Sequence, residues 1–402
     1  MNAITIQLPS SKSISNRLLI IQALCQNSFS IFKLSNAQDT QDLDRCLNSL
    51  DSLELHVGDG ATSMRFLLAY LALRNQSIIL SCGKSLKGRP IFELIQVLEM
   101  LHCEFNFLEE PYKMPLKLLK GISKPIPEVL EIDGSLSSQF VSAILLIGPY
   151  LGNPISIKLK GHLVSEPYLN MTIQLMRNFG IQIEQNAGYI NIPSSNYTGR
   201  DIQVEADWSA AVFFYALLGL QDEGKLYFPG LKKSGLQGDE ALIPFFRWFG
   251  IQTLESDGGI SIEKLNVDTP SSVGFDFTNC PDLFPAMAIF CAMKKVNCYF
   301  SGLQNLKHKE SNRLDVISEF LIAQKVKIIV PAQENGVYYF EMKSIQFKLN
   351  ESYATFMDHR IAMAFSLLKL RFPIFIENPE AVSKSFPDYW DEYKKLELEF
   401  IR

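Results

Sequence analysis

An internal repeat is the feature of this sequence that most constrains its fold. Four times, an apolar strand ends at a glycine-containing loop, and a helix and further strands follow. The loops begin at Gly83, Gly161, Gly230 and Gly302, at nearly even spacing. A repeat of this length is one supersecondary module, which can bury its apolar face only by stacking on its neighbours. The chain is therefore expected to fold as a set of similar modules.

Each regular copy carries a helix with apolar residues at three- and four-residue spacing, the pattern of a helix with one buried face. These helices are predicted at Arg89–Leu101, Glu166–Phe179, Gly238–Phe249 and Glu310–Ile322. Two less regular copies are found over Lys33–Leu50 and Phe375–Leu396. The predicted fold class is α/β (α+β), with six modules of one kind.

Six modules divide naturally into two domains of three. A polar segment, Glu205–Asp207, precedes an apolar helix and marks one boundary. Because the chain must also begin in one of the domains, a second crossing is expected near Ser10–Lys12. We therefore predict one domain over residues 12–205 and another over residues 1–11 and 206–402. A cleft between two such domains could close about a hinge.

Composition excludes several classes of partner. The 402 residues carry a net charge of −5, which argues against nucleic acid or an anionic membrane as the main partner. Seven scattered cysteines without a C-x-x-C pair predict reduced thiols in a cytoplasmic protein and no metal site. No export signal is visible, and the longest apolar runs are shorter than the roughly 20 residues of a membrane span.

The stretch Leu8–Arg17 is the first candidate for chemistry. After a short strand it places serine hydroxyls, the Lys12 ammonium and the Arg17 guanidinium at the start of an apolar helix. Backbone N–H groups and cations at a helix start form an anion site. An ordinary capped helix with solvated charges explains the spacing equally well.

Similar polar segments recur at other strand-to-helix ends. They are Gly58–Arg65, Lys87–Pro90, Asp133–Gln139, Ser165–Tyr168, Pro281–Pro285, Asn305–Arg313, Met357–Arg360 and Ala381–Asp388. Helix capping or a solvated charge explains most of them singly, although Asp133–Gln139 holds more polar groups than a cap needs. Recurrence at one kind of position favours a shared site for anions. Its cations would be Lys12, Arg17, Arg65, Arg89, Lys309, Arg313, Arg360 and Lys384.

These segments resemble, in order and over essentially the whole chain, the 5-enolpyruvylshikimate-3-phosphate synthase family of enolpyruvyl transferases. Leu8–Arg17 is similar to the family's L-P-G-S-K-S-x-S-N-R, and Gly58–Arg65 to its G-N-A-G-T-A-x-R. The K-x-R-P, D-G-S-x-S-S-Q-F, P-D, K-E-S-x-R, D-H-R and K-S-F-P-D-Y segments follow in register.

The resemblance implies two domains, each of three βαβαββ-type repeats around buried parallel helices (an inside-out α/β barrel). It also implies a reaction of chorismate and aromatic amino acid biosynthesis. By addition and elimination, the enolpyruvyl group of phosphoenolpyruvate passes to the 5-hydroxyl of shikimate 3-phosphate and phosphate is released. No metal or organic cofactor is implied, and the enzyme is expected to be a monomer.

The resemblance also assigns substrate contacts. Shikimate 3-phosphate would be held by Ser137, Ser138, Gln139, Ser165, Tyr168, Lys12, Ser13 and Arg17, and by Asp282, Asn305 and Lys309. Phosphoenolpyruvate would lie against Lys12, Arg89, Arg313, Arg360 and Lys384, with the backbone of Ala61 and Thr62 close by. Arg65 and His359, in the same motifs, complete the candidate set.

Three residues are expected to move protons. Addition needs a base for the 5-hydroxyl and an acid for the methylene carbon, and elimination reverses both transfers. We predict Asp282 as the base, Glu310 as the proton shuttle at the methylene carbon and Lys12 as an acid at the bridging oxygen. Asp282 is flanked by apolar residues, which favours a perturbed pKa; stabilisation of a helix N-terminus is the alternative.

The sequence departs from the family pattern at Ser10 (for Gly), Asp59 (for Asn), Ala61 (for Gly) and Asn312 (for Asp), and its second module is short. The Asp59 carboxylate is expected to weaken phosphoenolpyruvate binding unless a cation pairs with it. The Ala61 methyl is expected to reduce sensitivity to glyphosate, which is bulkier than phosphoenolpyruvate.

Two alternatives remain open. The sister enzyme that acts on UDP-N-acetylglucosamine uses a mobile-loop cysteine as acid. Cys82 and Cys103 flank a module instead, and the S-S-Q segment is of the shikimate type. The other alternative is a catalytically silent homologue that binds anions.

Overall fold

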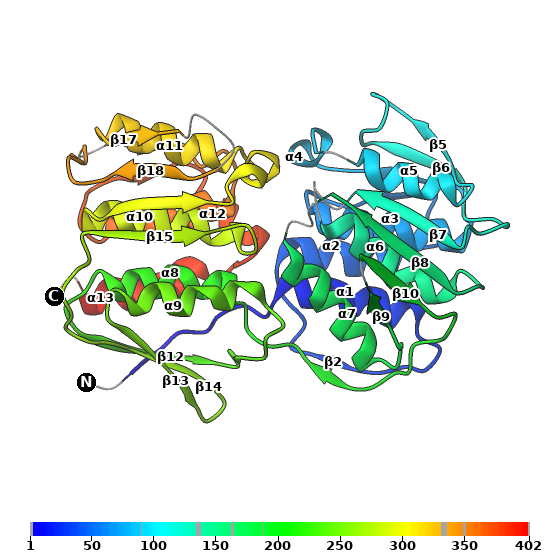
Figure 1. Ribbon diagram of the computed structural model, residues 1–402, viewed down its shortest axis with the longest axis horizontal. Coiled ribbons are helices and arrows are strands. Elements are labelled where there is room, and N and C mark those ends of the chain that lie inside the picture. The colour runs from blue at the N-terminus through cyan, green and yellow to red at the C-terminus, as the bar shows by residue number, and fades with distance from the viewer. Residues whose placement is uncertain are drawn as a thin grey trace. The chain divides into compact units, whose positions relative to one another are not determined.

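The computed structural model describes residues 3–89, 91–133, 138–161, 165–186, 188–330, 336–348 and 351–400. The chain forms two compact units (Figure 1). Unit 1 consists of Met1–Pro9 and Glu205–Arg402, and unit 2 of Ser10–Val204. The crossings expected from the sequence, at residues 11–12 and 205–206, fall beside these limits.

Within its described residues, unit 2 holds two four-stranded sheets of one topology. The first has the order β3 (Glu54–His56), β4 (Ile78–Ser81), β6 (Leu116–Lys120), β5 (Glu104–Phe107). The second has the order β7 (Val129–Asp133), β8 (Ile155–Lys160), β10 (Tyr189–Ile192), β9 (Glu184–Asn186). In each sheet the first two strands are parallel and the other pairs antiparallel. A short parallel pair, β2 (Ile31–Phe32) and β11 (Ile202–Gln203), belongs to the third module.

The described part of unit 1 repeats this plan. One sheet has the order β1 (Ile4–Thr5), β12 (Gly224–Pro229), β14 (Gly259–Lys264), β13 (Ile251–Ser256). The other has the order β15 (Ser272–Asp276), β16 (Asn297–Ser301), β18 (Tyr338–Glu341), β17 (Lys327–Ile329). The short parallel pair is β19 (Ser352–Tyr353) and β20 (Phe375–Ile376). The predicted α/β fold of repeated modules is confirmed, including two copies that are less regular.

Most helices predicted from apolar spacing are present. The four regular copies contain α5 (Phe92–Met100), α7 (Glu166–Asn178), α9 (Leu242–Arg247) and α11 (Arg313–Ala323). The two less regular copies contain α2 (Gln38–Leu47) and α13 (Tyr389–Phe400). Their ends differ from the prediction for local reasons. The helix expected from Gly238 begins with a 3₁₀ turn, η2 (Gly238–Ala241), since Pro244 cannot lie inside a longer α-helix. The helix expected from Glu310 begins at Arg313, because the Asn312 side chain caps it by accepting from the N–H of Asp315.

A trio of buried helices forms the core of each unit. In unit 2 these are α1 (Lys12–Leu24), α3 (Ala61–Arg74) and α6 (Ser138–Ile147); in unit 1 they are α8 (Trp208–Gly219), α10 (Phe284–Lys294) and α12 (His359–Lys369). Members of each trio pack against one another. Every residue of α8 is buried, which explains why its sequence is apolar on all sides. Five of the predicted site segments lie at or just before the N-terminal ends of trio helices, namely α1, α3, α6, α10 and α12. The other four lie at or before the starts of α5, α7, α11 and α13.

The remaining described helices are short. They are α4 (Lys84–Lys87), η1 (Gly148–Tyr150), η3 (Pro281–Leu283), η4 (Gln304–His308) and η5 (Pro379–Lys384). Turn residues between alternating apolar positions predict hairpins at Asn186–Gly188, Asp257–Gly259 and Glu334–Gly336. The hairpin at Asp257–Gly259 joins β13 to β14, with Gly258 at φ +72° as its turn requires. The hairpins expected at Asn186–Gly188 and Glu334–Gly336 include residues outside the described part.

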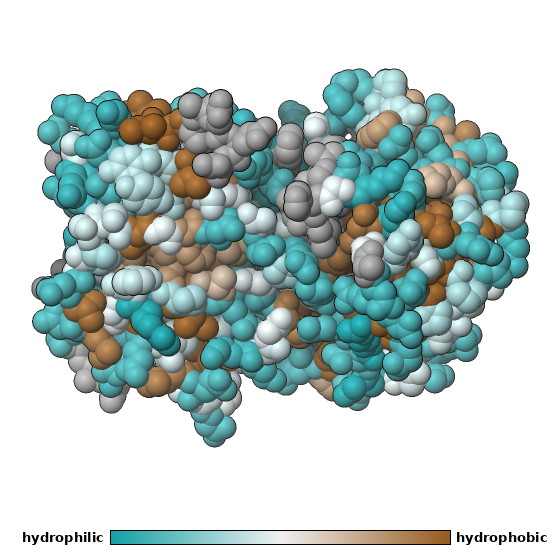
Figure 2. Space-filling model, viewed as in Figure 1, coloured by the Kyte–Doolittle hydropathy of each residue, from teal (hydrophilic) through white to brown (hydrophobic). Residues whose placement is uncertain are grey.

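Hydrophilic residues cover most of the face seen in Figure 2, and apolar residues occur there in small groups. None of the helices that could be described has the length and apolar character of a membrane span.

Candidate active site

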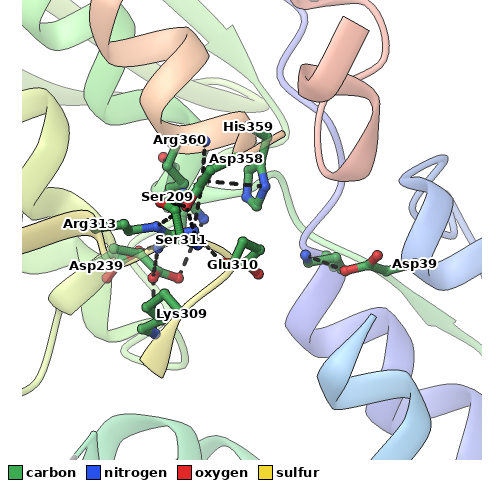
Figure 3. A network of polar contacts seen from close by, with 12 residues as sticks. Asp39, Ser209, Asp239, Lys309, Glu310, Ser311, Arg313, Asp358, His359 and Arg360 are labelled. Atoms are coloured by element: carbon green, nitrogen blue, oxygen red, sulfur yellow. Dashed lines mark hydrogen bonds and ion pairs between the residues drawn. The ribbon is translucent and has the colours of Figure 1, made fainter. Parts of the chain in front are cut away.

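Arg313 is the centre of a buried ionic cluster in unit 1 (Figure 3). Its side chain is 1% exposed. Its Nε and Nη2 donate to the two oxygens of Asp358 at 2.8 and 3.1 Å. Nη1 donates to Asp282 Oδ1 at 2.7 Å, and Nη2 also donates to Glu310 Oε2 at 2.5 Å. Burial acts to lower the pKa of Arg313, but the three carboxylates outweigh it and raise the pKa, so the guanidinium stays charged.

Asp282, in the 3₁₀ turn η3 that precedes α10, faces three cations. Besides Arg313, the Lys309 ammonium lies 3.1 Å from Oδ1, and Arg360 Nη2 lies 3.5 Å from Oδ2. Burial acts to raise the pKa of Asp282, but Lys309, Arg360 and Arg313 together hold it well below its usual range. The perturbation expected from the apolar neighbours in sequence is thus present, with the opposite sign to that of burial alone. In this arrangement the carboxylate is a weak base.

Asp358 fixes the start of α12. Its side chain is fully buried, accepts from the backbone N–H of Arg360 as the N-cap, and accepts from Ser311 Oγ at 2.9 Å. The His359 ring is buried beside it, with Nδ1 4.0 Å from Asp358 Oδ1. One carboxylate therefore joins the K-E-S-x-R segment to the D-H-R segment.

Arg360 is connected through Ser209 to another buried carboxylate, that of Asp239. Its Nη1 donates to the backbone carbonyl of Ser209 at 2.7 Å, and the Ser209 hydroxyl donates to Asp239 Oδ2. Asp239 is 2% exposed, and burial, reinforced by the nearby Asp282 charge, raises its pKa to about 7. This residue can gain or lose its proton near neutral pH.

In unit 2, the N-terminal ends of α1, α2 and α3 are tied together. The Lys12 ammonium pairs with Asp39 Oδ2 at 2.7 Å, and both side chains are mostly buried. Asn16 donates to Ser63 Oγ and accepts from Thr40 Oγ1. Ser63 Oγ in turn donates to the backbone carbonyl of Asp39. These bonds fix Lys12 at one corner of the helix trio.

Arg17 connects two of the segments assigned to shikimate 3-phosphate. Its Nη1 donates to the carbonyl of Ser13 at 2.8 Å and its Nη2 to that of Tyr168 at 3.0 Å. Nε donates to Thr172 Oγ1, and the guanidinium lies over the Phe66 ring. Burial lowers the pKa of Arg17 to about 10, so it remains a cation at neutral pH among uncharged acceptors.

Arg65 and Gln139 also meet. Arg65 Nη1 donates to Gln139 Oε1, and the guanidinium lies 4.5 Å from the centre of the Phe140 ring. Ser138 is buried at the first residue of α6. Ser137, the third member of the S-S-Q segment, lies outside the described residues.

Ser165 stands just before α7 in an unusual backbone conformation. Its φ is +58°, in the left-handed region that residues other than glycine rarely adopt, and its hydroxyl makes no capping hydrogen bond. Such strain is found at ligand-binding positions more often than elsewhere. This geometry is compatible with the predicted contact to a substrate.

The remaining candidates occupy the predicted kinds of position. Ala61 is buried and Thr62 half-buried in the first turn of α3. Arg89 follows α4, Asn305 lies in η4, and Lys384 ends η5; all three are half-buried. The eight cations expected to bind anions are divided equally, with Lys12, Arg17, Arg65 and Arg89 in unit 2 and Lys309, Arg313, Arg360 and Lys384 in unit 1.

Three buried carboxylates were not predicted as site residues. Asp39 pairs with Lys12, Asp358 with Arg313, and Asp239 with Ser209. Asp39 and Asp358 lie at or near helix starts, where an acid reads as an ordinary cap. In the described residues no group of three or more His, Cys, Asp or Glu side chains has the arrangement of a metal site.

The chain is similar to known proteins over most of its length. Residues 48–393 match the family model for EPSP synthase (3-phosphoshikimate 1-carboxyvinyltransferase). The 3-phosphoshikimate 1-carboxyvinyltransferase of Bacteroides fragilis is 33% identical, over 97% of this chain and 94% of its own length. That of Aliivibrio fischeri is 31% identical, over 97% and 96%.

Solved structures show the same fold. EPSP synthase from Acinetobacter baumannii superposes with a TM-score of 0.74 at 20% identity, covering 98% of this chain and 96% of that one. The enolpyruvyl transferase NikO from Streptomyces tendae gives a TM-score of 0.70 at 14% identity, covering 98% and 94%.

Proposed function

The chain belongs to the EPSP synthase (3-phosphoshikimate 1-carboxyvinyltransferase) family, and we propose that it transfers the enolpyruvyl group of phosphoenolpyruvate to the 5-hydroxyl of shikimate 3-phosphate, with release of phosphate. The observation that carries this proposal is the match to relatives of that name over 97% of the chain. The buried cations at the helix starts of each unit support it, because both substrates are multiply anionic.

Shikimate 3-phosphate is assigned to the helix starts of unit 2. Ser138 and Gln139 begin α6, Ser165 and Tyr168 begin α7, and Arg17 holds the Tyr168 carbonyl and the Ser13 carbonyl in place. Hydroxyls and an amide next to a buried cation suit a phosphate and a polyol ring. Ser137 belongs to the same S-S-Q segment as Ser138 and Gln139, and it is assigned to this substrate from the sequence resemblance alone.

Phosphoenolpyruvate is assigned to cations of both units. Lys12 and Arg89 would bind it from unit 2, and Arg313, Arg360 and Lys384 from unit 1. In the structure Arg313 is occupied by Asp358, Asp282 and Glu310, so a substrate carboxylate would have to replace one of these contacts.

The base role of Asp282 depends on substrate. Without substrate, three cations keep its pKa low. Substrate anions that bind Lys309, Arg313 and Arg360 would partly neutralise the positive charge that these residues present to Asp282. The proton affinity of Asp282 should therefore rise when substrate binds. Glu310 is proposed to carry the proton at the methylene carbon, and Lys12, next to Asp39, to protonate the bridging oxygen. Replacement of Asp282 by Asn or Glu310 by Gln with no change in turnover or pH–rate profile would remove these roles.

The alternatives give distinct results. Burial raises the pKa of Cys82 to about 11 and that of Cys103 to about 12, which makes neither a ready counterpart of the acidic cysteine of the UDP-N-acetylglucosamine enzyme. Phosphate release should require phosphoenolpyruvate and shikimate 3-phosphate together. Release with UDP-N-acetylglucosamine as acceptor would favour the sister enzyme, and no release with either acceptor a silent homologue.

We also propose that the protein is a cytoplasmic monomer that works without a metal or organic cofactor. All seven cysteines of the described structure are free, which suits a reducing compartment. Sedimentation of the purified protein and assay after treatment with a chelator test these points.

A further inference from the structure

The Asp59 carboxylate lies in unit 2, at the end of the loop that joins β3 to α3. Asp59 stands where the family pattern has an amide side chain, and it is not one of the residues proposed to bind or transform the substrates.

The loops that follow the parallel strands β3 and β4 lie side by side. β3 and β4 pair in register, with His56 opposite Ser81. Beyond that pair the loops stay in contact: the N–H of Gly83 donates to the carbonyl of Gly58 at 2.8 Å. The N–H of Ser85 then donates to Asp59 Oδ1 at 3.0 Å.

The carboxylate also packs against Gly83. A Cβ atom added at Gly83 would lie 2.4 Å from Asp59 Oδ1 and 2.5 Å from its Cγ. Heavy atoms that are not bonded do not approach so closely, so a larger residue at position 83 would displace the Asp59 carboxylate. Asp59 therefore contacts the second loop in two ways, through a hydrogen bond from Ser85 and through packing of its carboxylate against Gly83.

Each loop leads directly to a segment assigned to phosphoenolpyruvate. Asp59 is two residues before Ala61, the first residue of α3. Ser85 lies in α4, and the N–H of Arg89 donates to the carbonyl of Leu86 at the end of that short helix. The Asp59 side chain, which belongs to the first loop, thus also contacts the second loop.

We propose that Asp59 is a positioning residue, which fixes the distance between the start of α3 and the Arg89 segment so that both can contact phosphoenolpyruvate. This inference rests on the proposed function. Its basis is that one carboxylate oxygen of Asp59 accepts from a backbone N–H of the neighbouring loop. The bond needs an oxygen acceptor, which aspartate and asparagine both supply. The expectation that the charge at position 59 weakens phosphoenolpyruvate binding stays a prediction.

The test compares Asp59→Ala with Asp59→Asn. Misplacement of a binding group by a fraction of an ångström to an ångström costs a factor on the order of 10 to 100 in transition-state binding. Asp59→Ala is expected to raise KM for phosphoenolpyruvate about tenfold, with KM for shikimate 3-phosphate changed less than about threefold. Asp59→Asn should restore the first value to within about threefold of wild type.

A second pair of variants tests the steric contact. Gly83→Ala should damage phosphoenolpyruvate binding in the wild-type background and have a smaller additional effect with Asp59→Ala, because the clashing atoms are then absent. Equal effects in the two backgrounds would contradict the contact.

Hydrogen exchange at the Ser85 amide gives a readout that does not need turnover. Asp59→Ala should accelerate this exchange and Asp59→Asn should not. If wild type releases no phosphate, the proposed function fails, whereas the exchange result still decides whether Asp59 holds the loop. Unchanged exchange, equal impairment by Ala and Asn, or an equal rise in both KM values would overturn the inference.

Discussion

Removal of the Asp358 carboxylate should destabilise unit 1 strongly. Asp358 is fully buried, makes two charged hydrogen bonds to Arg313, and caps α12. Loss of one partner of a buried ion pair costs about 3–5 kcal/mol. Arg313 keeps Asp282 and Glu310, so the cost should fall near about 3 kcal/mol.

Two replacements separate the ion pair from the cap. Asp358→Asn removes the charge but leaves an oxygen that can accept from the N–H of Arg360, so it should cost about 3 kcal/mol. Asp358→Ala also removes the cap, which adds about 1 kcal/mol. Asp315→Asn, at an exposed carboxylate on α11, is the control and should change stability by less than about 1 kcal/mol.

Urea unfolding followed by tryptophan fluorescence measures these costs. Trp208, Trp248 and Trp390 all belong to unit 1, so the signal reports the unit that contains Asp358. If both Asp358 variants unfold within about 1 kcal/mol of the Asp315→Asn control, the Arg313–Asp358 pair is not a structural anchor and the reasoning is refuted.

Three further predictions concern charge and shape. The pKa of Asp239 is raised from 3.8 to about 7, so the folded protein should lose up to about 4 kcal/mol of stability as pH rises from 4 through 7. Urea unfolding of Asp239→Asn at several pH values should show that this loss is abolished. If the variant keeps the wild-type dependence of stability on pH, the assignment of the loss to Asp239 is contradicted. Arg17→Lys cannot reproduce the guanidinium bonds to Ser13, Tyr168 and Thr172, so it should lower the free energy of unfolding by about 2 kcal/mol, measured by circular dichroism, and raise KM for shikimate 3-phosphate. Wild-type values for both quantities would argue against a role of Arg17 in holding these segments together. Ala61→Gly removes a buried methyl and should tighten inhibition by glyphosate, whereas equal inhibition constants would show that the methyl does not narrow the site.

The sequence was informative where local pattern determines structure. Helices α6 and α8 come from apolar runs that only a buried helix explains, and the repeated strand–loop–helix order predicted the modules. Strand order was not accessible in the same way. β1 pairs with β12, more than half the chain away, and no local pattern specifies such a partner.

Charge networks were harder to predict than positions. The motifs placed Arg313 and Asp282 at helix starts, but spacing alone cannot show that Arg313 is 1% exposed and contacts three carboxylates. Asp239 illustrates the same limit, because its pKa depends on burial and on Asp282, which is distant in sequence. These properties arise only when separate modules pack together.

The product formed from ¹³C-labelled phosphoenolpyruvate tests the central claim most directly. Incubation with shikimate 3-phosphate, followed by NMR, should show the labelled enolpyruvyl group in ether linkage to the 5-oxygen, with one phosphate released for each group transferred. Label that stays in phosphoenolpyruvate, or appears as free pyruvate, would contradict enolpyruvyl transfer by this protein.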